Sequence, residues 1–365
     1  DEDFVGRAWT GVQGRGVPGA QEAEWARLQS DWDEFEAGAA GVRRTRISEP
    51  FPFAAPAYRF HEHNPYVHTA TRHHMAHARG VRDALDDSVL EREAAVYHDP
   101  HDAGAWYSLG LCQQENEREV QAIAALRRAV ELDPHLQGAW LALAVSYTNE
   151  NERDETLAAI ERWIDASTAY SDVVMAYRTS EAARRASAQE RIVGELLAMA
   201  RASVARAGDE TAADVQVALG VLFNASSEYT KAVDCFSTAL GMRPDDYLLY
   251  NRIGATLSNS GRSDEALLYY EHALALRPGF ARCHFNMSIS CLNLKMYQEA
   301  AEHAYTALTL QHASDDDGAL GKNLQSTNLW ETLRVALELM DRPDLARRCA
   351  DRDIAQLSLD DIVTF

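Results

Sequence analysis

The sequence predicts an all-α chain in which pairs of antiparallel helices repeat and stack into a superhelix. Three observations support this fold: residue types return every 34 residues, small and large residues alternate at fixed places, and a proline closes three of the five copies. A small residue lets two helices approach, large residues fill the gap between them, and proline ends the second helix. The first copy consists of Trp106, Leu109, Gly110, Ala122, Leu126, Ala129 and Pro134.

The later copies keep the same places. The second carries Trp140, Leu143, Ala144, Tyr147 and Ile160. Three more form a second block, which contains Leu219, Gly220, Phe223, Ala232, Phe236, Ala239 and Pro244, then Ile253, Gly254, Leu257, Ala266, Tyr270, Ala273 and Pro278, then Met287, Ser288, Cys291, Ala300, Ala304 and Ala307. This pattern is the tetratricopeptide-repeat signature. Because one pair cannot bury its apolar face alone, the pairs stack around a concave groove, where we expect the functional residues.

Composition fits a soluble globular protein. The chain has 365 residues, of which 46% are hydrophobic and 25% charged. No run reaches the roughly 18 apolar residues that span a bilayer, and a net charge of −21 argues against nucleic acid as a partner. The chain begins at Asp1, so we expect an upstream region. The cysteines show no CxxC pair, which favours reduced intracellular thiols at Cys112, Cys235, Cys283, Cys291 and Cys349.

Residues 1–57 predict a mostly disordered arm, because they are rich in Gly, Ala, Arg and Glu and lack a sustained period. One island differs, with apolar residues on one helical stripe and acidic residues opposite. This stripe consists of Trp25, Leu28, Trp32 and Phe35. It is typical of a linear motif that folds into a partner's groove, although it could also pack on its own domain.

Residues 58–170 form the predicted N-terminal repeat block, with an eroded copy over 72–100. The histidine-rich stretch at its start contains His61, His63, His68, His73, His74 and His77. Of these, His73 and His77 share a helical face. No HExxH motif and no nearby cysteine or regularly placed carboxylate completes a ligand set. We therefore predict a solvated histidine face, no metal and no cofactor.

Residues 171–211 are helical in pattern but lack the signature, so they predict a degenerate hinge between the blocks. The C-terminal block spans 212–312. Residues 313–365 predict a polar loop followed by C-terminal helices, of which the first covers 328–340 and the last runs from Pro343 to about Gln356.

The groove-facing places on the first helix of each pair are rich in asparagine, which is a mediocre helix former. They hold Val145, Thr148, Asn149, Asn224, Asn251, Arg252, Ala255, Asn259, Arg282, Asn286, Ser290 and Asn293. An asparagine amide offers donors and an acceptor to a peptide backbone, and Arg282 offers a fork that takes a carboxylate. The set predicts a site for the C-terminal end of an extended peptide. Solvated polar positions are the alternative.

Four stretches resemble the cargo-binding repeats of the peroxisomal targeting signal type 1 receptor family (peroxin-5). They are residues 143–150, 219–224, 245–256 and 286–293. The likeness extends through Trp330 and covers roughly residues 58–350, with part of an N-terminal arm before it. It implies a non-enzymatic import receptor that binds C-terminal Ser-Lys-Leu-type signals of matrix proteins. Such a receptor is cytoplasmic and cycles to the docking proteins of the peroxisomal membrane.

The resemblance also implies a role for each site residue. The terminal carboxylate and last peptide units are held by Asn149, Asn251, Arg282 and Asn286. The preceding backbone and small residue are held by Asn224, Asn259, Ser290 and Asn293. The final leucine is bordered by Val145, Thr148 and Arg252, and the basic penultimate side chain lies near Glu150. The stripe from Trp25 to Phe35 resembles Trp-x-x-x-aromatic docking motifs with a partial fit, because Trp32 meets Phe35 at i+3. The family's N-terminal cysteine has no counterpart in this sequence.

Other classes remain open. A chaperone-tail adaptor grips acidic tails with several Lys and Arg, whereas these places are dominated by asparagine. A non-import paralogue of the receptor would share the groove. The chain could also be the regulatory repeat array of an enzyme or a histidine-metal hydrolase, but no nucleophile elbow, phosphate loop or metal set supports catalysis.

Overall fold

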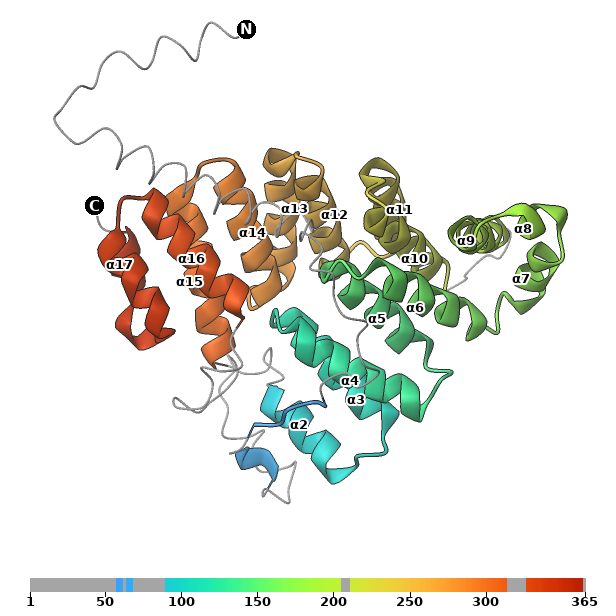
Figure 1. The fold of residues 1–365 in the computed structure, drawn as a ribbon, viewed down its shortest axis with the longest axis horizontal. Helices are drawn as coiled ribbons and strands as arrows, with labels where there is room; N and C mark the ends of the chain where they lie inside the picture. Colours follow the sequence, from blue (N-terminus) through green and yellow to red (C-terminus); the bar gives the residue numbers. More distant parts are fainter. Residues whose placement is uncertain (1–56, 62–63, 68–88, 205–210, 314–325, 364–365) are drawn as a thin grey trace, which may run out of the picture. The chain divides into compact units, whose positions relative to one another are not determined.

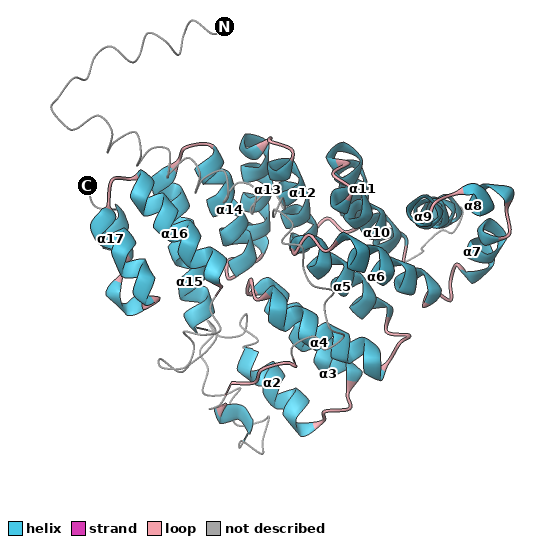
Figure 2. Ribbon diagram, in the orientation of Figure 1, coloured by secondary structure: helices cyan, strands magenta, loops and turns pink. Residues whose placement is uncertain are grey.

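The computed structural model describes residues 57–61, 64–67, 89–204, 211–313 and 326–363. Across these residues every regular element is a helix and none is a strand (Figure 2). The all-α fold predicted from the 34-residue period is therefore confirmed. None of the described helices is both long enough and apolar enough to cross a membrane.

The helices follow one another in chain order, and within each repeat block every helix packs against the next (Figure 1). The first block contains the short 3-10 helix η2 (Pro65–Val67), α2 (Val89–His98), α3 (Ala103–Glu115), α4 (Glu119–Leu132), α5 (Gln137–Asn149) and α6 (Arg153–Asp165). The second contains α10 (Ala212–Ala225), α11 (Tyr229–Met242), α12 (Tyr247–Asn259), α13 (Ser263–Leu276), α14 (Ala281–Asn293) and α15 (Tyr297–Ala313). Between them lie α7 (Ser171–Arg178), α8 (Glu181–Arg185) and α9 (Ala188–Val204).

Small residues in the signature bring the two helices of a pair into close contact. A methyl group added to Gly254 of α12 would lie 2.6 Å from a ring carbon of Tyr270 on α13. At Gly220 of α10 the corresponding distance to the ring of Phe236 on α11 is 2.5 Å. Both rings are buried. The interior of each of these two pairs is thus filled by one large side chain against a bare backbone.

Each pair turns through one residue in the left-handed conformation. These residues recur at the repeat spacing and have positive φ angles, at Glu117, Asn151, Ser227, Gly261 and Lys295. The residue that follows each of them donates a hydrogen bond from its backbone N–H to the carbonyl oxygen five residues earlier. An example is the 3.0 Å bond from Arg118 N to Gln113 O. This is the Schellman ending of a helix. Asp341 makes the same turn between α16 and α17, so the chain ends in a further pair that the signature did not reveal.

That last pair consists of α16 (Thr327–Leu339) and α17 (Pro343–Arg348), followed by 3-10 turns at Cys349–Asp351 and Ile354–Gln356 and by α18 (Leu359–Val363). The prediction of one helix from Pro343 to about Gln356 is therefore wrong. Arg352 has a φ of 48°. A right-handed helix cannot pass through that left-handed conformation.

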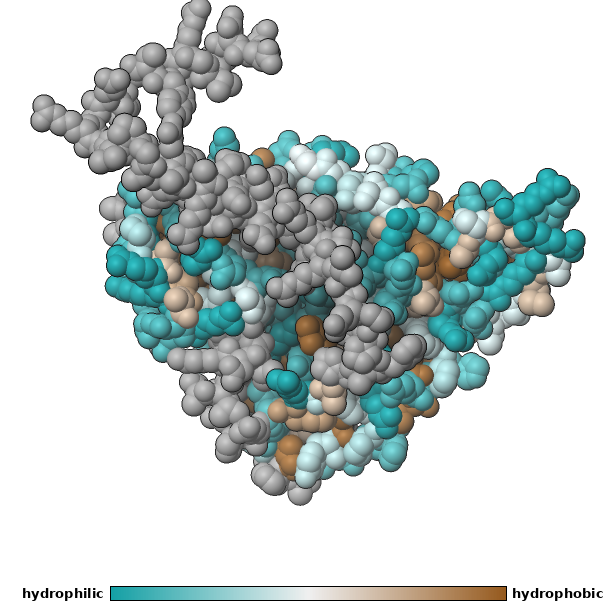
Figure 3. Space-filling view, viewed as in Figure 1, coloured by the Kyte–Doolittle hydropathy of each residue, from teal (hydrophilic) through white to brown (hydrophobic). Residues whose placement is uncertain are grey.

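The segment from α7 to α9 is folded against α6 through charged side chains. Arg178 on α7 donates to both oxygens of Glu195 on α9, at 2.9 and 2.8 Å, and Arg191 approaches the same carboxylate at 2.9 Å. The Glu195 side chain is fully buried. Arg178 also pairs with Asp165 of α6 at 2.8 Å. Figure 3 shows the described surface over α7–α9 as mainly hydrophilic. Whether this segment acts as a hinge stays a prediction.

Candidate functional site

A buried charged cluster lies where the turn between α3 and α4 meets α14. Arg282 of α14 donates from Nε to the backbone oxygen of Gln114, 168 positions earlier, at 2.9 Å. Its Nη2 lies 2.8 Å from Glu117 Oε2 and 2.9 Å from Glu119 Oε1. The side chains of Arg282, Glu117 and Glu119 are 11%, 6% and 5% exposed. The cluster thus joins the first block to the second in the protein interior.

Glu119 connects predicted site residues from both blocks. Its Oε1, which faces Arg282, also accepts a hydrogen bond from Asn149 Nδ2 of α5, and its Oε2 accepts one from Ser146 Oγ at 3.1 Å. The structure therefore brings Asn149 and Arg282 together at one carboxylate oxygen. Sequence reasoning missed Glu119. It starts the second helix of its pair, a place that in the next copy is held by Arg153, so no repeat pattern marks it.

Three carboxylates surround this one guanidinium. Burial raises the pKa of Glu117 to about 7; Arg282 opposes that shift, and Glu119 and Glu150 add to it. Burial by itself would lower the pKa of Arg282, but the neighbouring carboxylates raise it overall. Arg282 consequently stays charged, while Glu117 is poised to take up a proton near neutral pH.

Asparagine and serine side chains join the pair α12–α13 to α14. Asn286 donates from Nδ2 to Oδ1 of the buried Asn251 at 3.0 Å. Ser290, also buried, donates to Ser258 Oγ at 2.9 Å. Asn293 donates to Ser263 Oγ at 3.3 Å. Three of the predicted residues of α14 therefore reach toward the preceding pair, and two of the predicted asparagines touch directly.

Arg252 lies in a different charged environment, between the two blocks. Burial lowers its pKa, while Asp246 and Asp214 act in the opposite direction. The same neighbourhood includes Tyr107 of α3, whose pKa is raised by burial and then by Asp214. Gly138 lies against the Tyr107 ring, because a methyl group there would lie 2.8 Å from its hydroxyl. Arg252 thus contributes its charge where α3, α10 and α12 converge.

The remaining predicted residues are more dispersed. Thr148 donates to Ala144 O at 2.8 Å and lies 3.3 Å from the hydroxyl of Thr156, so it faces the second helix of its own pair. Asn259 is exposed at the end of α12, and Val145 and Glu150 are half-buried on α5 and at its C-cap. Asn224 lies near the C-terminal end of α10. Its buried Oδ1 has no hydrogen-bond partner among the described residues.

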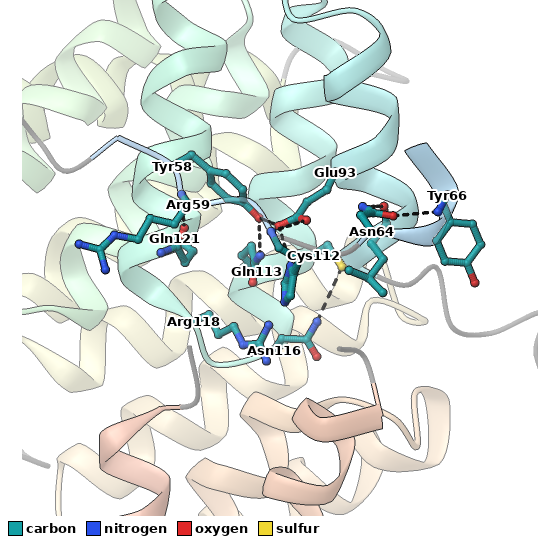
Figure 4. Close-up of polar contacts among 12 residues, drawn as sticks. Tyr58, Arg59, Asn64, Tyr66, Glu93, Cys112, Gln113, Asn116, Arg118 and Gln121 are labelled. Carbon is teal, nitrogen blue, oxygen red and sulfur yellow. Dashed lines mark hydrogen bonds and ion pairs between the residues drawn. The ribbon is translucent and has the colours of Figure 1, made fainter. Parts of the chain in front are cut away.

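Some predictions lie outside the described residues. They concern the stripe formed by Trp25, Leu28, Trp32 and Phe35, and the histidines His63, His68, His73, His74 and His77. His61 is described, and its Nδ1 lies 2.9 Å from Glu93 Oε1. The buried Glu93 also accepts from the Tyr58 hydroxyl at 2.7 Å (Figure 4). Within the described residues no group of three or more His, Cys, Asp or Glu is placed to hold a metal ion.

The α3–α4 turn makes further contacts with the second block. The Tyr247 hydroxyl of α12 donates to Glu115 Oε1 at 2.6 Å, and Arg277 lies 3.4 Å from the other oxygen. Gln311, buried on α15, donates to Asn116 O at 2.6 Å and accepts from Arg118 Nη2 at 3.3 Å. The turn that carries Glu117 is therefore fixed by α12, α14 and α15 together.

Comparison with known proteins agrees with this architecture. Tetratricopeptide-repeat family models match residues 82–136 and 247–280. A "Peroxisomal targeting signal receptor" of Kluyveromyces lactis is 34% identical over 342 residues, covering 93% of this chain and 57% of the relative. The receptor of the same name in Candida albicans is 42% identical over 267 residues, 72% of this chain and 44% of the relative. A human "PEX5-related protein" is 37% identical over 344 residues, 90% of this chain and 54% of the relative.

Proposed function

Because this chain belongs to the family of peroxisomal targeting signal receptors, we propose that it binds the C-terminal Ser-Lys-Leu-type tripeptide of peroxisomal matrix proteins. The family consists of receptors rather than enzymes. The chain spans less than two thirds of the length of the relatives compared with it. Delivery of cargo to a membrane docking complex, and cycling from the cytoplasm, are therefore part of the proposal.

One observation carries the proposal: amide and guanidinium donors from both blocks are held near one another by part-buried hydrogen bonds and a buried ion pair. Asn286 touches Asn251 at 3.0 Å, and Glu119 holds both Asn149 and Arg282. An extended peptide presents C=O groups along its backbone and a carboxylate at its end. Asparagine amides suit the first and a guanidinium suits the second.

The net negative charge of the site also suits the basic side chain at the penultimate position of the peptide. Glu117, Glu119 and Glu150 together outnumber Arg282. A lysine ammonium entering this surplus of negative charge is attracted electrostatically. The acidic tail of a chaperone is repelled for the same reason, which separates this proposal from the adaptor alternative.

The proposal is tested by titrating a labelled peptide that ends in Ser-Lys-Leu, as the free acid and as the C-terminal amide. We expect the amide to bind about 2–3 kcal/mol more weakly, because charged donors lose their ionic partner. Equal affinity for both forms contradicts recognition of the carboxylate. Tighter binding of a Glu-Glu-Val-Asp peptide would instead identify a co-chaperone adaptor.

A non-import paralogue is the second candidate, because the chain is similar both to proteins named as receptors and to a human protein named only as "PEX5-related". Peptide titration does not separate the two, because both would share the site. Import of a fluorescent protein ending in Ser-Lys-Leu, in cells that lack their own receptor, does separate them. Restoration of import supports the receptor, and loss of import on changing Trp25 and Trp32 to Ala assigns docking to the arm.

A further inference from the structure

Glu117 is unusual for its place in the repeat. The equivalent turn residues are all exposed, and only the last of them is acidic: Asn151, Ser227, Gly261, Lys295 and Asp341. Glu117 is buried, and its φ of 57° lies in the left-handed region that favours Gly, Asn and Asp. The turn itself requires neither a carboxylate nor burial. A buried carboxylate on a left-handed backbone points to a use for its charge.

Among the described residues, Arg282 is the only ion-pair partner of Glu117 Oε2. Glu117 Oε2 lies 2.8 Å from Arg282 Nη2 but off the hydrogen-bonding direction, and it has no hydrogen-bond partner among the described residues. Glu119, by contrast, is also engaged by Asn149 and Ser146. Within the described residues, no hydrogen bond involves Arg282 Nη1. Arg282 thus retains donor capacity for a ligand, while its charge is shared with two glutamates.

We propose that Glu117 competes from within the protein with the C-terminal carboxylate of a bound peptide for the charge of Arg282, and thereby sets how strongly the site prefers a free C-terminus. The inference rests on the proposed function and adds a residue that limits its specificity. With Glu117 ionised, a peptide carboxylate meets a guanidinium that two glutamates already neutralise. When Glu117 is uncharged, the charge of Arg282 is less neutralised, so it attracts the peptide carboxylate more strongly.

A pH dependence follows. The charged groups that face Glu117 are Arg282 of α14, Glu119 of α4 and Glu150 at the end of α5. Because the pKa of Glu117 is raised to about 7, this carboxyl is mostly protonated at pH 6 and mostly ionised at pH 8. The preference for the free acid over the amide should be larger at pH 6. Neither the peptide carboxylate nor its lysine titrates between these values.

The test compares the ratio of amide to acid dissociation constants for one Ser-Lys-Leu peptide, so effects on the lysine cancel. Glu117→Gln removes the charge and keeps the shape. Glu131→Gln is the matched control, because it removes one negative charge from an exposed residue of α4. At pH 8 we expect Glu117→Gln to raise the ratio at least about fivefold, the lower end of coupling between two sites. Glu131→Gln should leave it unchanged.

The outcomes distinguish this inference from the proposed function. If the wild type binds acid and amide equally, both fail. If the wild type prefers the acid but Glu117→Gln leaves the ratio unchanged or lowers it, only the competition is rejected. If Glu117→Gln does not fold, the wild-type ratio at pH 6 and pH 8 decides: a rise at pH 6 supports the competition, and a constant ratio overturns it.

Discussion

Helices pack closely both in the pair α12–α13 and in the segment α7–α9. The interface of the pair is apolar, whereas the interface of the segment also contains charged side chains. In the pair, the Tyr270 ring lies on the bare backbone of Gly254, and the contact is apolar. In the segment, Tyr177 lies on Gly194 in the same way, but beside it the buried Glu195 is held by Arg178 and Arg191. One interface depends on shape, and the other also depends on the balance of charge.

The difference explains why only one of these regions is recognisable from sequence. Small and large apolar residues at a fixed spacing can come only from a packed pair. A glutamate that is surrounded by arginines in the sequence usually lies on the solvated surface of a helix. The signature therefore identifies helices that pack by shape, and it passes over helices whose packing depends on a buried ion network.

The largest expected effect is in the charged region. Glu195→Ala leaves two arginines facing a buried space without their carboxylate. Breaking a buried pair in this way costs about 3–5 kcal/mol, and we expect about 3 because Asp165 and Glu161 still engage the arginines. Urea unfolding measures the loss, and hydrogen exchange should locate it in α7–α9.

Glu181→Ala is the matched control, since it removes an exposed glutamate from α8 that pairs with Arg185. Exposed pairs of this kind contribute less than about 0.5 kcal/mol. Similar small losses in both variants would show that the buried network does not stabilise the segment, and the contrast with α12–α13 would then rest on shape alone.

A smaller effect is expected where shape decides. Gly254→Ala places a methyl group 2.6 Å from the buried ring of Tyr270, so α12 and α13 must separate. Overpacking costs typically about 1–3 kcal/mol, and the higher helix propensity of Ala returns up to about 1 kcal/mol. We expect a net loss of about 2 kcal/mol in the free energy of unfolding.

Gly241→Ala provides the control on α11, because a methyl group there meets no atom within 4 Å. This variant should be more stable by about 0.5–1 kcal/mol. If both substitutions stabilise the protein, the close approach of α12 and α13 is not what fixes the pair.

The helix pairs could be predicted from sequence because each is defined by residues within one period. The contact between Asn251 and Asn286 follows from the same register, since both belong to first helices of adjacent pairs. The burial of Glu117 and Glu119 could not be predicted. It arises because their turn meets α14, more than a hundred residues later, and that contact depends on how the pairs stack. The periodic pattern carries no information on it.

The smallest expected effect is on stability at acidic pH, and it comes from His284, a titratable residue at a position that recurs in the repeat. Trp106 and Trp140 donate from the indole to the oxygen of a proline six residues earlier, at 3.0 and 2.9 Å. His284 occupies this place in α14, with Nε2 3.2 Å from Pro278 O and Nδ1 3.1 Å from Nδ1 of His303. Burial, and then His303, lowers the pKa of His284 to about 4.

His284 is therefore protonated near pH 6.5 in the unfolded chain, but only near pH 4 in the folded protein. Stability from this group is complete above pH 6.5 and is lost as the pH falls toward 4. Allowing for partial solvent screening, we expect a loss on the order of 1–2 kcal/mol, measured as a lower Tm at pH 4.5 than at pH 7.

Glu117 acts in the opposite direction over the same range. Its raised pKa means that the folded protein is stabilised as the pH falls from about 7 toward 4.5. The informative quantity is therefore the difference in pH dependence between His284→Gln and the wild type. Gln keeps a donor for Pro278 O but does not titrate, so its Tm should fall less on acidification. Parallel curves for the two proteins would mean that His284 is protonated without cost in the fold, and that this position tolerates charge as readily as the α7–α9 segment does.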